Sequence, residues 1–248
     1  AAVTGLLLAL TLPATAPYWL AAVGGIFAIV VVKGLSGGLG QNIFNPALAA
    51  RAFLMLLWPA WLVRYAPAGA ELPLFGSTAD VVSAATPLHD MVMPALPAAS
   101  PADMLLGNIG GCIGEVSALA LLIGGIILVL FKLINWRVPV VYIGTVAVFA
   151  GIVHYFFPGV TPPPLFHLLT GGLILGAVFM ATDMVTSPIT PTGCIVFAFG
   201  CGVITTVIRI WGNYPEGVSF SILFMNALVP LIDRYCTVRP FGYVAKRG

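Results

Sequence analysis

The sequence is dominated by long apolar runs, several of them long enough to cross a lipid bilayer. A transmembrane helix needs about 20 mostly apolar residues in succession. The runs that meet or approach this length are 17–34, 43–63, 110–132, 138–157, 193–211 and 218–235. Only 7% of the residues are charged, against about 25% in a typical soluble domain. We therefore predict an all-α polytopic membrane protein.

Two shorter apolar runs, 2–12 and 166–182, look like broken helices. Each contains a Thr-Gly pair near its start, ends in a turn rich in Pro and Thr, and precedes two full spans. The second of these spans contains Asn45 in one case and Asn226 in the other. Such a weak internal repeat is typical of transporter folds. Because two more helices precede the second broken run, symmetry predicts an inverted five-plus-five repeat whose first two helices are missing from this chain.

The repeat divides the chain into four parts. They are the remainder of the first membrane repeat (1–63), an external loop (64–109), the second membrane repeat (110–236) and a cytoplasmic tail (237–248). The side of the membrane on which each loop lies follows from Lys and Arg, which are enriched in cytoplasmic loops. The basic residues that set this orientation are Lys132, Arg137, Arg234, Arg239, Lys246 and Arg247. Residues 33–41 then lie inside, and Arg64 is an exception to the rule.

The basic residues, cysteines and histidines limit the kinds of function that the sequence allows. The net charge of +2 and the scattered basic residues argue against nucleic-acid binding. The four cysteines lie far apart without a CxxC pair, and the three histidines lack metal-ligand spacing. We expect the cysteines to be small buried residues, with metal or cluster ligation as the alternative. We therefore predict no metal site.

The expected external loop contains a short motif, Asp80-Val-Val-Ser-Ala-Ala-Thr-Pro-Leu88. A Thr before Pro among small residues is compatible with plain turn chemistry. The pattern Asp-x-x-Ser-(Gly/Ala)-Ala-Thr nevertheless resembles the signal at which a flavin transferase links FMN through its phosphate to a threonine.

Two further segments, 37–54 and 179–188, are similar to matching stretches of one family, which comprises RnfD and NqrB. RnfD is the D subunit of the Rnf ion-translocating electron-transport complex, and NqrB is its relative in the sodium-pumping NADH:quinone reductase. The resemblance runs from the first residue to about Arg239, and the short loop and tail favour RnfD. It implies an architecture that resembles the urea-transporter fold.

The resemblance also implies flavin sites. Thr86 would carry FMN as a phosphoester, and the recognition motif would include Asp80, Ser83 and Ala85. A second flavin, riboflavin, would bind without a covalent bond near Asn42 and Asn45 on the cytoplasmic side. Helix capping is the alternative for these asparagines, since Asn before Pro46 is a favourable N-cap, and the two roles are compatible. Possible additional flavin contacts are His89 and Arg51.

Acidic residues inside a membrane are unfavourable and call for a reason. The resemblance makes Asp183 and Asp233 candidates for an ion path. Capping of the following turn is the alternative for Asp183, and pairing with an interfacial base such as Arg234 is the alternative for Asp233. Glu115 lies near an expected helix start, where the helix dipole favours an acid. Snorkelling to an interface is the simplest expectation for the two intramembrane arginines, Arg51 and Arg209.

The resemblance implies a membrane subunit of an Rnf-type ferredoxin:NAD⁺ oxidoreductase complex that couples electron transfer through FMN and riboflavin to Na⁺ or H⁺ translocation. Its expected partners are the flavin transferase and other Rnf-type subunits, especially the covalent-FMN G subunit outside and the C subunit inside. The expected location is a bacterial or archaeal inner membrane. A urea-transporter-like channel or secondary transporter, and an inert assembly subunit, are the alternatives.

Overall fold

The computed structural model describes residues 1–38, 40–66, 100–212 and 217–237, and these residues form helices with no β-strand. In chain order the helices are α1 (Ala2–Leu10), α2 (Tyr18–Ile26), η1 (Phe27–Gly34), α3 (Pro46–Leu57), α4 (Pro59–Leu62), α6 (Pro101–Leu106), α7 (Ala118–Leu130), α8 (Arg137–Phe156), α9 (Pro164–Leu169), α10 (Leu173–Leu175), η2 (Gly176–Met180), α11 (Pro191–Trp211) and α12 (Val218–Tyr235). The elements η1 and η2 are π-helical continuations of α2 and α10.

Three helices of the described residues, α8, α11 and α12, are each long and apolar enough to cross a membrane. They confirm the expected helices at 138–157, 193–211 and 218–235 within two residues at each end. The broken character of the second short run is also confirmed, because 166–182 divides among α9, α10 and η2. The chain is therefore a helical protein whose elements have the composition of membrane spans.

Two expected spans differ from the structure. The run 43–63 is not one helix: α3 begins at Pro46 and ends at Leu57, and Pro59 starts the separate helix α4. A proline restricts the residue before it to extended conformations, so the helix ends there. With 12 residues, α3 is about 18 Å long at 1.5 Å per residue, which is less than the roughly 30 Å of a hydrocarbon core.

The run 110–132 also differs, because its helix α7 starts only at Ala118. The preceding residues are non-helical, with a turn at 113–115, and they pair with the end of the first broken segment. Pro13 and Cys112 form an antiparallel bridge, and Gly114 N–H donates to Leu10 O at 2.7 Å. A Cβ atom at Gly114 would lie 2.9 Å from that oxygen, so only glycine allows this approach. Non-helical backbone at membrane depth is tolerated where protein buries it.

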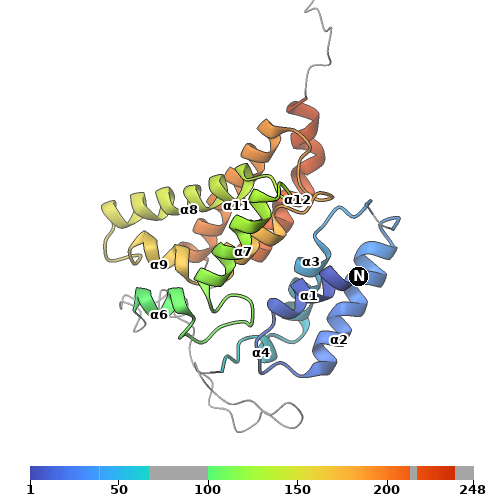
Figure 1. The fold of residues 1–248 in the computed structure, drawn as a ribbon, viewed down its shortest axis with the longest axis horizontal. Coiled ribbons are helices and arrows are strands. Elements are labelled where there is room, and N and C mark those ends of the chain that lie inside the picture. Colours follow the sequence, from blue (N-terminus) through green and yellow to red (C-terminus); the bar gives the residue numbers. More distant parts are fainter. Residues whose placement is uncertain (39, 67–99, 213–216, 238–248) are drawn as a thin grey trace, which may run out of the picture.

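The helices form two groups that follow the two halves of the chain. Helices α1, α2, η1, α3 and α4 gather on one side of the molecule in Figure 1, and α7 to α12 gather on the other. Within the second group α11 packs against both α8 and α12, and α12 also contacts α3 of the first group. This α12–α3 contact brings the two halves together near the centre of the molecule.

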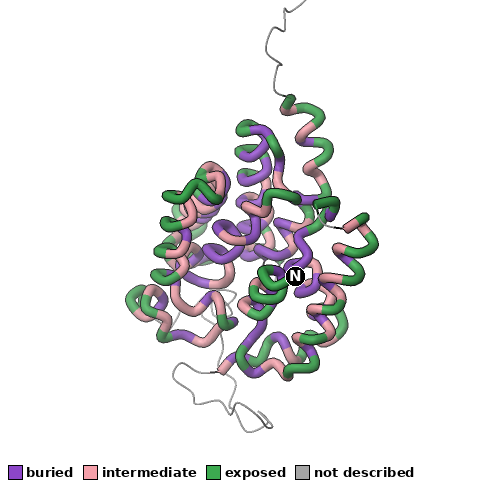
Figure 2. Tube along the Cα trace, turned by 45° about the vertical axis from the view of Figure 1, so that its right-hand side comes forward, coloured by how far each residue is buried: buried purple, intermediate pink, exposed green. Residues whose placement is uncertain are grey.

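The outer faces of the helices are apolar. Exposed residues lie along the outside of the tube in Figure 2. Many of them are large hydrophobic side chains, for example Val30, Leu56, Val140, Ile152 and Phe224. So many exposed large apolar side chains are unusual for a soluble monomer and are typical of a surface that meets lipid or another protein.

The interior of the second group is held by close helix contacts and by a ring of hydroxyls. Tyr142 Oη is 2.6 Å from Thr205 Oγ1 and 2.9 Å from Ser221 Oγ, and the latter two oxygens are 2.7 Å apart. These residues are fully buried and join α8, α11 and α12. Hydroxyls that bond across helices hold membrane bundles together where hydrophobic burial contributes little.

Candidate functional site

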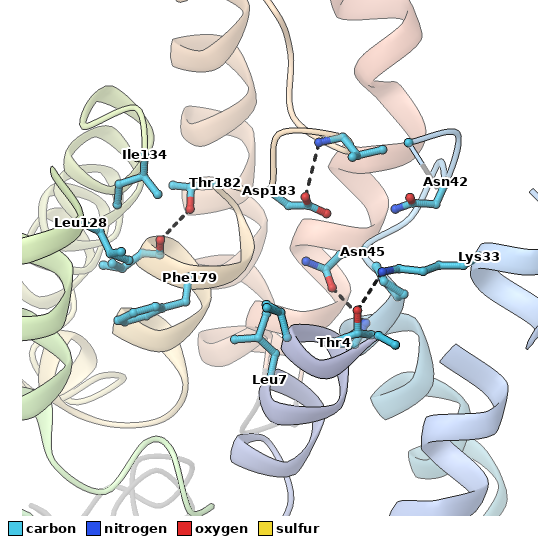
Figure 3. Close-up of a pocket in the computed structure, with 17 residues that line it drawn as sticks. Thr4, Leu7, Lys33, Asn42, Asn45, Leu128, Ile134, Phe179, Thr182 and Asp183 are labelled. Atoms are coloured by element: carbon cyan, nitrogen blue, oxygen red, sulfur yellow. Dashed lines mark hydrogen bonds between the residues drawn. The ribbon is translucent and has the colours of Figure 1, made fainter. Parts of the chain in front are cut away.

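A pocket of about 390 Å³ lies where the beginnings of α1 and α3 meet the end of η2 (Figure 3). Its volume falls in the range of roughly 300–1,000 Å³ typical of small-molecule sites. The wall combines apolar side chains with a few polar ones. The polar side chains of the lining are Thr4, Lys33, Asn42, Asn45, Thr182 and Asp183. An apolar cavity with a few convergent polar groups is the usual form of a ligand or cofactor site.

Asn45 lines the pocket and links two of the elements that form its wall. Its side-chain oxygen accepts hydrogen bonds from Ala47 N at 3.0 Å and Leu48 N at 3.3 Å, which confirms the predicted N-cap of α3. Its side-chain nitrogen donates to Met180 O at 3.1 Å, at the end of η2. The Asn45 amide therefore joins α3, in the first group of helices, to the end of η2, in the second group.

Asn226 extends this link to α12. In the orientation of its amide that satisfies its neighbours, its nitrogen donates to Thr186 O at 3.0 Å and its oxygen accepts from Asn45 N at 3.1 Å. The two asparagines that occupy similar places in the predicted repeat thus bond to each other. Asn42 lies beside them in the pocket wall, is 5% exposed, and donates to Phe44 O at 3.1 Å.

Lys33 and Thr4 form the basic edge of the pocket. The Lys33 ammonium donates to the Thr4 hydroxyl at 2.9 Å, and Figure 3 shows the two side chains meeting at the rim. Neither residue was predicted for this site from the sequence. The available signal was the Thr-Gly pair that opens each broken segment, together with a lysine at the end of the following span.

The two ion-path candidates, Asp183 and Asp233, accept hydrogen bonds from different residues of the segment between η2 and α11. Asp183 lines the pocket, and its carboxylate accepts from the Thr186 hydroxyl at 3.3 Å and from Val185 N at 3.4 Å. The turn-capping alternative for Asp183 is therefore confirmed, and the pocket faces the same carboxylate. Asp233 lies on α12 outside the pocket lining, and it accepts from Ile189 N at 3.2 Å.

The expectation that the intramembrane arginines snorkel is wrong for both residues. Arg51 and Arg209 are only 6% and 5% exposed. Arg209 donates to His167 O at 2.7 Å and to Thr170 O at 3.2 Å, and Arg51 donates to Thr11 O and faces the Cys112 sulfur. Each guanidinium thus satisfies carbonyl groups that a helix end leaves without partners. Arg51 does not line the large pocket.

The proposed covalent site lies outside the described residues. This applies to Thr86, to the motif residues Asp80, Ser83 and Ala85, and to His89. Among the residues that the structure does describe, no group of three or more His, Cys, Asp or Glu side chains is arranged to hold a metal ion.

Comparison with known proteins places these features in a family. A sequence model described as the NQR2, RnfD, RnfE family matches residues 1–242. The D subunit of the Na⁺-translocating ferredoxin:NAD⁺ oxidoreductase complex of Acetobacterium woodii is 47% identical, over 98% of this chain and 72% of the relative. The D subunit of the ion-translocating oxidoreductase complex of Stutzerimonas stutzeri is 43% identical, over 99% of this chain and 76% of the relative.

A third relative names a different ion. The D subunit of the proton-translocating ferredoxin:NAD⁺ oxidoreductase complex of Clostridium ljungdahlii is 44% identical, over 96% of this chain and 73% of the relative. Relatives named for sodium and for protons are thus similar to this chain to almost the same degree. With a family match over nearly its whole length and these relatives, the chain belongs to the NQR2, RnfD, RnfE family.

Proposed function

We propose that this chain is the membrane-embedded D subunit of an Rnf-type ion-translocating ferredoxin:NAD⁺ oxidoreductase complex, with FMN on Thr86 and riboflavin in the pocket around Asn42 and Asn45. The observation that carries the proposal is the match to relatives with these names over almost the entire chain. The helical structure and the apolar outer surface support residence in a membrane. The inner membrane of a bacterium is the proposed location, since the named relatives are bacterial.

The residues of the pocket fit a flavin. Phe179 supplies an aromatic side chain to the wall, and the Asn42 and Asn45 amides can donate to and accept from the edge of a ring system. Lys33 brings a cation and Asp183 an anion to the same cavity. When bound, flavins supply one- and two-electron redox chemistry, while the protein determines their position. The role of this chain is thus to orient the ring through the amides and to keep water away with apolar residues.

Two similar contacts, one to a Thr hydroxyl and one to a Thr carbonyl, support the proposed inverted repeat. Lys33, at the end of the span that follows the first broken segment, bonds to Thr4 in that segment. Arg209, at the end of the span that follows the second, bonds to Thr170 in its own segment. Each basic side chain reaches the Thr of a Thr-Gly pair. We propose that these contacts lie at opposite faces of the membrane, with Lys33 inside and Arg209 outside.

The orientation defines what the protein can do. With the pocket inside and Thr86 in the external loop, the two flavins would lie near opposite faces of the bilayer. Electrons could then cross the membrane between them, while the C subunit on the cytoplasmic face and the covalent-FMN G subunit on the outer face continue the path. The flavin transferase would modify Thr86 before the complex operates.

The decisive experiment for this function is in-gel fluorescence of the denatured protein after co-expression with the flavin transferase. We expect the wild-type band to fluoresce and Thr86→Ala to be dark. Thr78→Ala, in the same loop, serves as the matched control and should fluoresce like the wild type. A dark wild-type band, or a fluorescent Thr86→Ala band, would refute covalent FMN at this residue.

A further inference from the structure

A second, much smaller cavity lies at the junction of the two broken segments. Its volume is about 20 Å³, and its wall includes Thr11, Arg51, Glu115, Gly172 and Ser219. A cavity needs roughly 10–15 Å³ to hold one water molecule. The space therefore suits a single small solute, and both a buried cation and a buried anion of the protein face it.

Arg51 reaches the cavity from α3. Its guanidinium donates to Thr11 O, at the end of α1, and lies 3.6 and 3.7 Å from the Cys112 sulfur. The side chain is 6% exposed. Arg51 thus has neutral partners that hold it in place, so its position does not depend on an acid alone.

Glu115 reaches the cavity from the turn at residues 113–115, before α7. Its Oε1 accepts from Cys112 N at 3.0 Å, and the residue is 6% exposed. Two glycines make room for its carboxylate. A Cβ atom at Gly111 would lie 3.4 Å from Oε1, and one at Gly172 would lie 3.3 Å from Oε2. The carboxylate is thus enclosed by backbone from both halves of the chain.

Burying two opposite charges at this place is not a simple way to stabilise a protein. A buried ion pair often contributes less than well-packed apolar residues of similar size. Ionisable groups inside a membrane are rare and mark ion pathways or proton relays by default. The junction of two interrupted helices is also where backbone and side-chain oxygens become available to a small cation. These points together favour a transport role over a structural one.

We propose that Glu115 is the carboxylate at which the coupling cation binds in the middle of this protein. The bound cation replaces Arg51 as the positive charge that neutralises this carboxylate. The proposal rests on the ion-translocating function proposed above. In the resting state Arg51 neutralises Glu115 across the cavity. A proton on the carboxylate, or a sodium ion between the carboxylate and the Ser219 hydroxyl, takes over this neutralisation. The site then carries one net positive charge, and the contacts of the Arg51 guanidinium with Thr11 O and the Cys112 sulfur stabilise it until the cation leaves.

The test uses the complete complex in proteoliposomes and measures cations transported per electron transferred. We expect Glu115→Gln to keep covalent FMN and subunit assembly but to lower this ratio at least tenfold. Asp103→Asn is the matched control and should leave the ratio unchanged, because this acid bonds to Ser100 at the exposed start of α6. A wild-type ratio in Glu115→Gln would overturn the proposal.

Two further variants distinguish loss of cation binding at Glu115 from a folding defect, and a flavin measurement distinguishes it from failure of the proposed function. If Glu115→Gln assembles poorly, the neutral pair Arg51→Gln/Glu115→Gln should restore assembly without restoring transport; transport at the wild-type ratio would contradict the proposal. Glu115→Asp should shift the half-saturating sodium concentration at fixed pH, or the half-saturating proton concentration at fixed sodium, by at least threefold, and no shift in either would count against it. Absence of flavin from the wild-type protein would instead refute the proposed function.

Discussion

Asn42 and Asn45 lie three residues apart and have different roles. Asn45 uses its oxygen for the cap of α3 and one amide hydrogen for Met180, so its geometry is fixed by the protein. Asn42 makes one local bond, to Phe44 O, and lines the pocket. Asn42 is therefore the better residue with which to test ligand binding, because its replacement removes less of the fold.

We expect Asn42→Leu to weaken retention of the noncovalent flavin. Loss of a buried hydrogen bond costs about 1–3 kcal/mol, which corresponds to roughly five- to 150-fold weaker binding. The measurement is the amount of free flavin released by acid precipitation of the purified complex, relative to covalent FMN. Asn108→Leu changes an exposed asparagine away from the pocket and should retain the wild-type amount. Equal release from both variants would show that Asn42 does not contact the flavin.

Single residues also show where sequence reasoning succeeds and where it stops. The Asn45 cap was predictable, because an Asn-Pro pair before a helix has a local geometric meaning. The burial of Arg51 and Arg209 was not, because their partners are carbonyl groups of broken segments about 40 residues away. Thr4 and Lys33 were missed as pocket residues for the same reason, since 29 residues separate the two side chains that bond.

At the scale of helices, close packing between α8 and α11 depends on small residues. A Cβ atom at Gly202 of α11 would lie 2.6 Å from Thr145 Cβ and 3.1 Å from Tyr142 O on α8. Both neighbours are part of a rigid helix, and Tyr142 is also held by the hydroxyl ring. The contact therefore has little freedom to adjust to a larger side chain.

We expect Gly202→Ala to destabilise the protein by about 1–3 kcal/mol, the usual effect of adding atoms to a well-packed interior. Gly144→Ala on α8 is the matched control, because no atom lies within 4 Å of its Cβ position. Alanine also has about 1 kcal/mol better helix propensity than glycine, so the control should be neutral or more stable. Unfolding in detergent titrations measures both, and a stable Gly202→Ala would refute the predicted α8–α11 clash.

Apolar composition predicted which segments belong to the membrane but could not predict their conformation throughout. The helices α8, α11 and α12 were found because their runs are long and lack internal breaks. The residues just before Ala118 belong to the same expected run, but they form a turn whose backbone bonds to Leu10 O and Leu12 O. A turn that bonds to a distant broken helix leaves no periodic signal in its own sequence.

At the scale of the molecule, the two groups of helices meet through Asn45, Asn226 and the carbonyl of Met180. The large pocket lies beside this contact, and the small cavity with Arg51 and Glu115 lies further along α3. A movement of one group of helices against the other would therefore change the shapes of the large pocket and of the small cavity at the same time. Under the two proposals above, such a movement would connect redox chemistry at the pocket with a cation at Glu115.

The orientation of the whole molecule can be tested with one cysteine on each face, in a Cys236→Ser background that leaves only buried native cysteines among the described residues. Gln41 and Gly159 are both exposed, and a side chain at Gly159 meets no atom within 4 Å. Because Lys and Arg favour the cytoplasmic side, we expect a membrane-impermeant maleimide to label Gly159→Cys in intact cells. Gln41→Cys should react only after permeabilisation. Labelling of both cysteines from the same side would contradict the orientation and, with it, the placement of the two flavins at opposite faces.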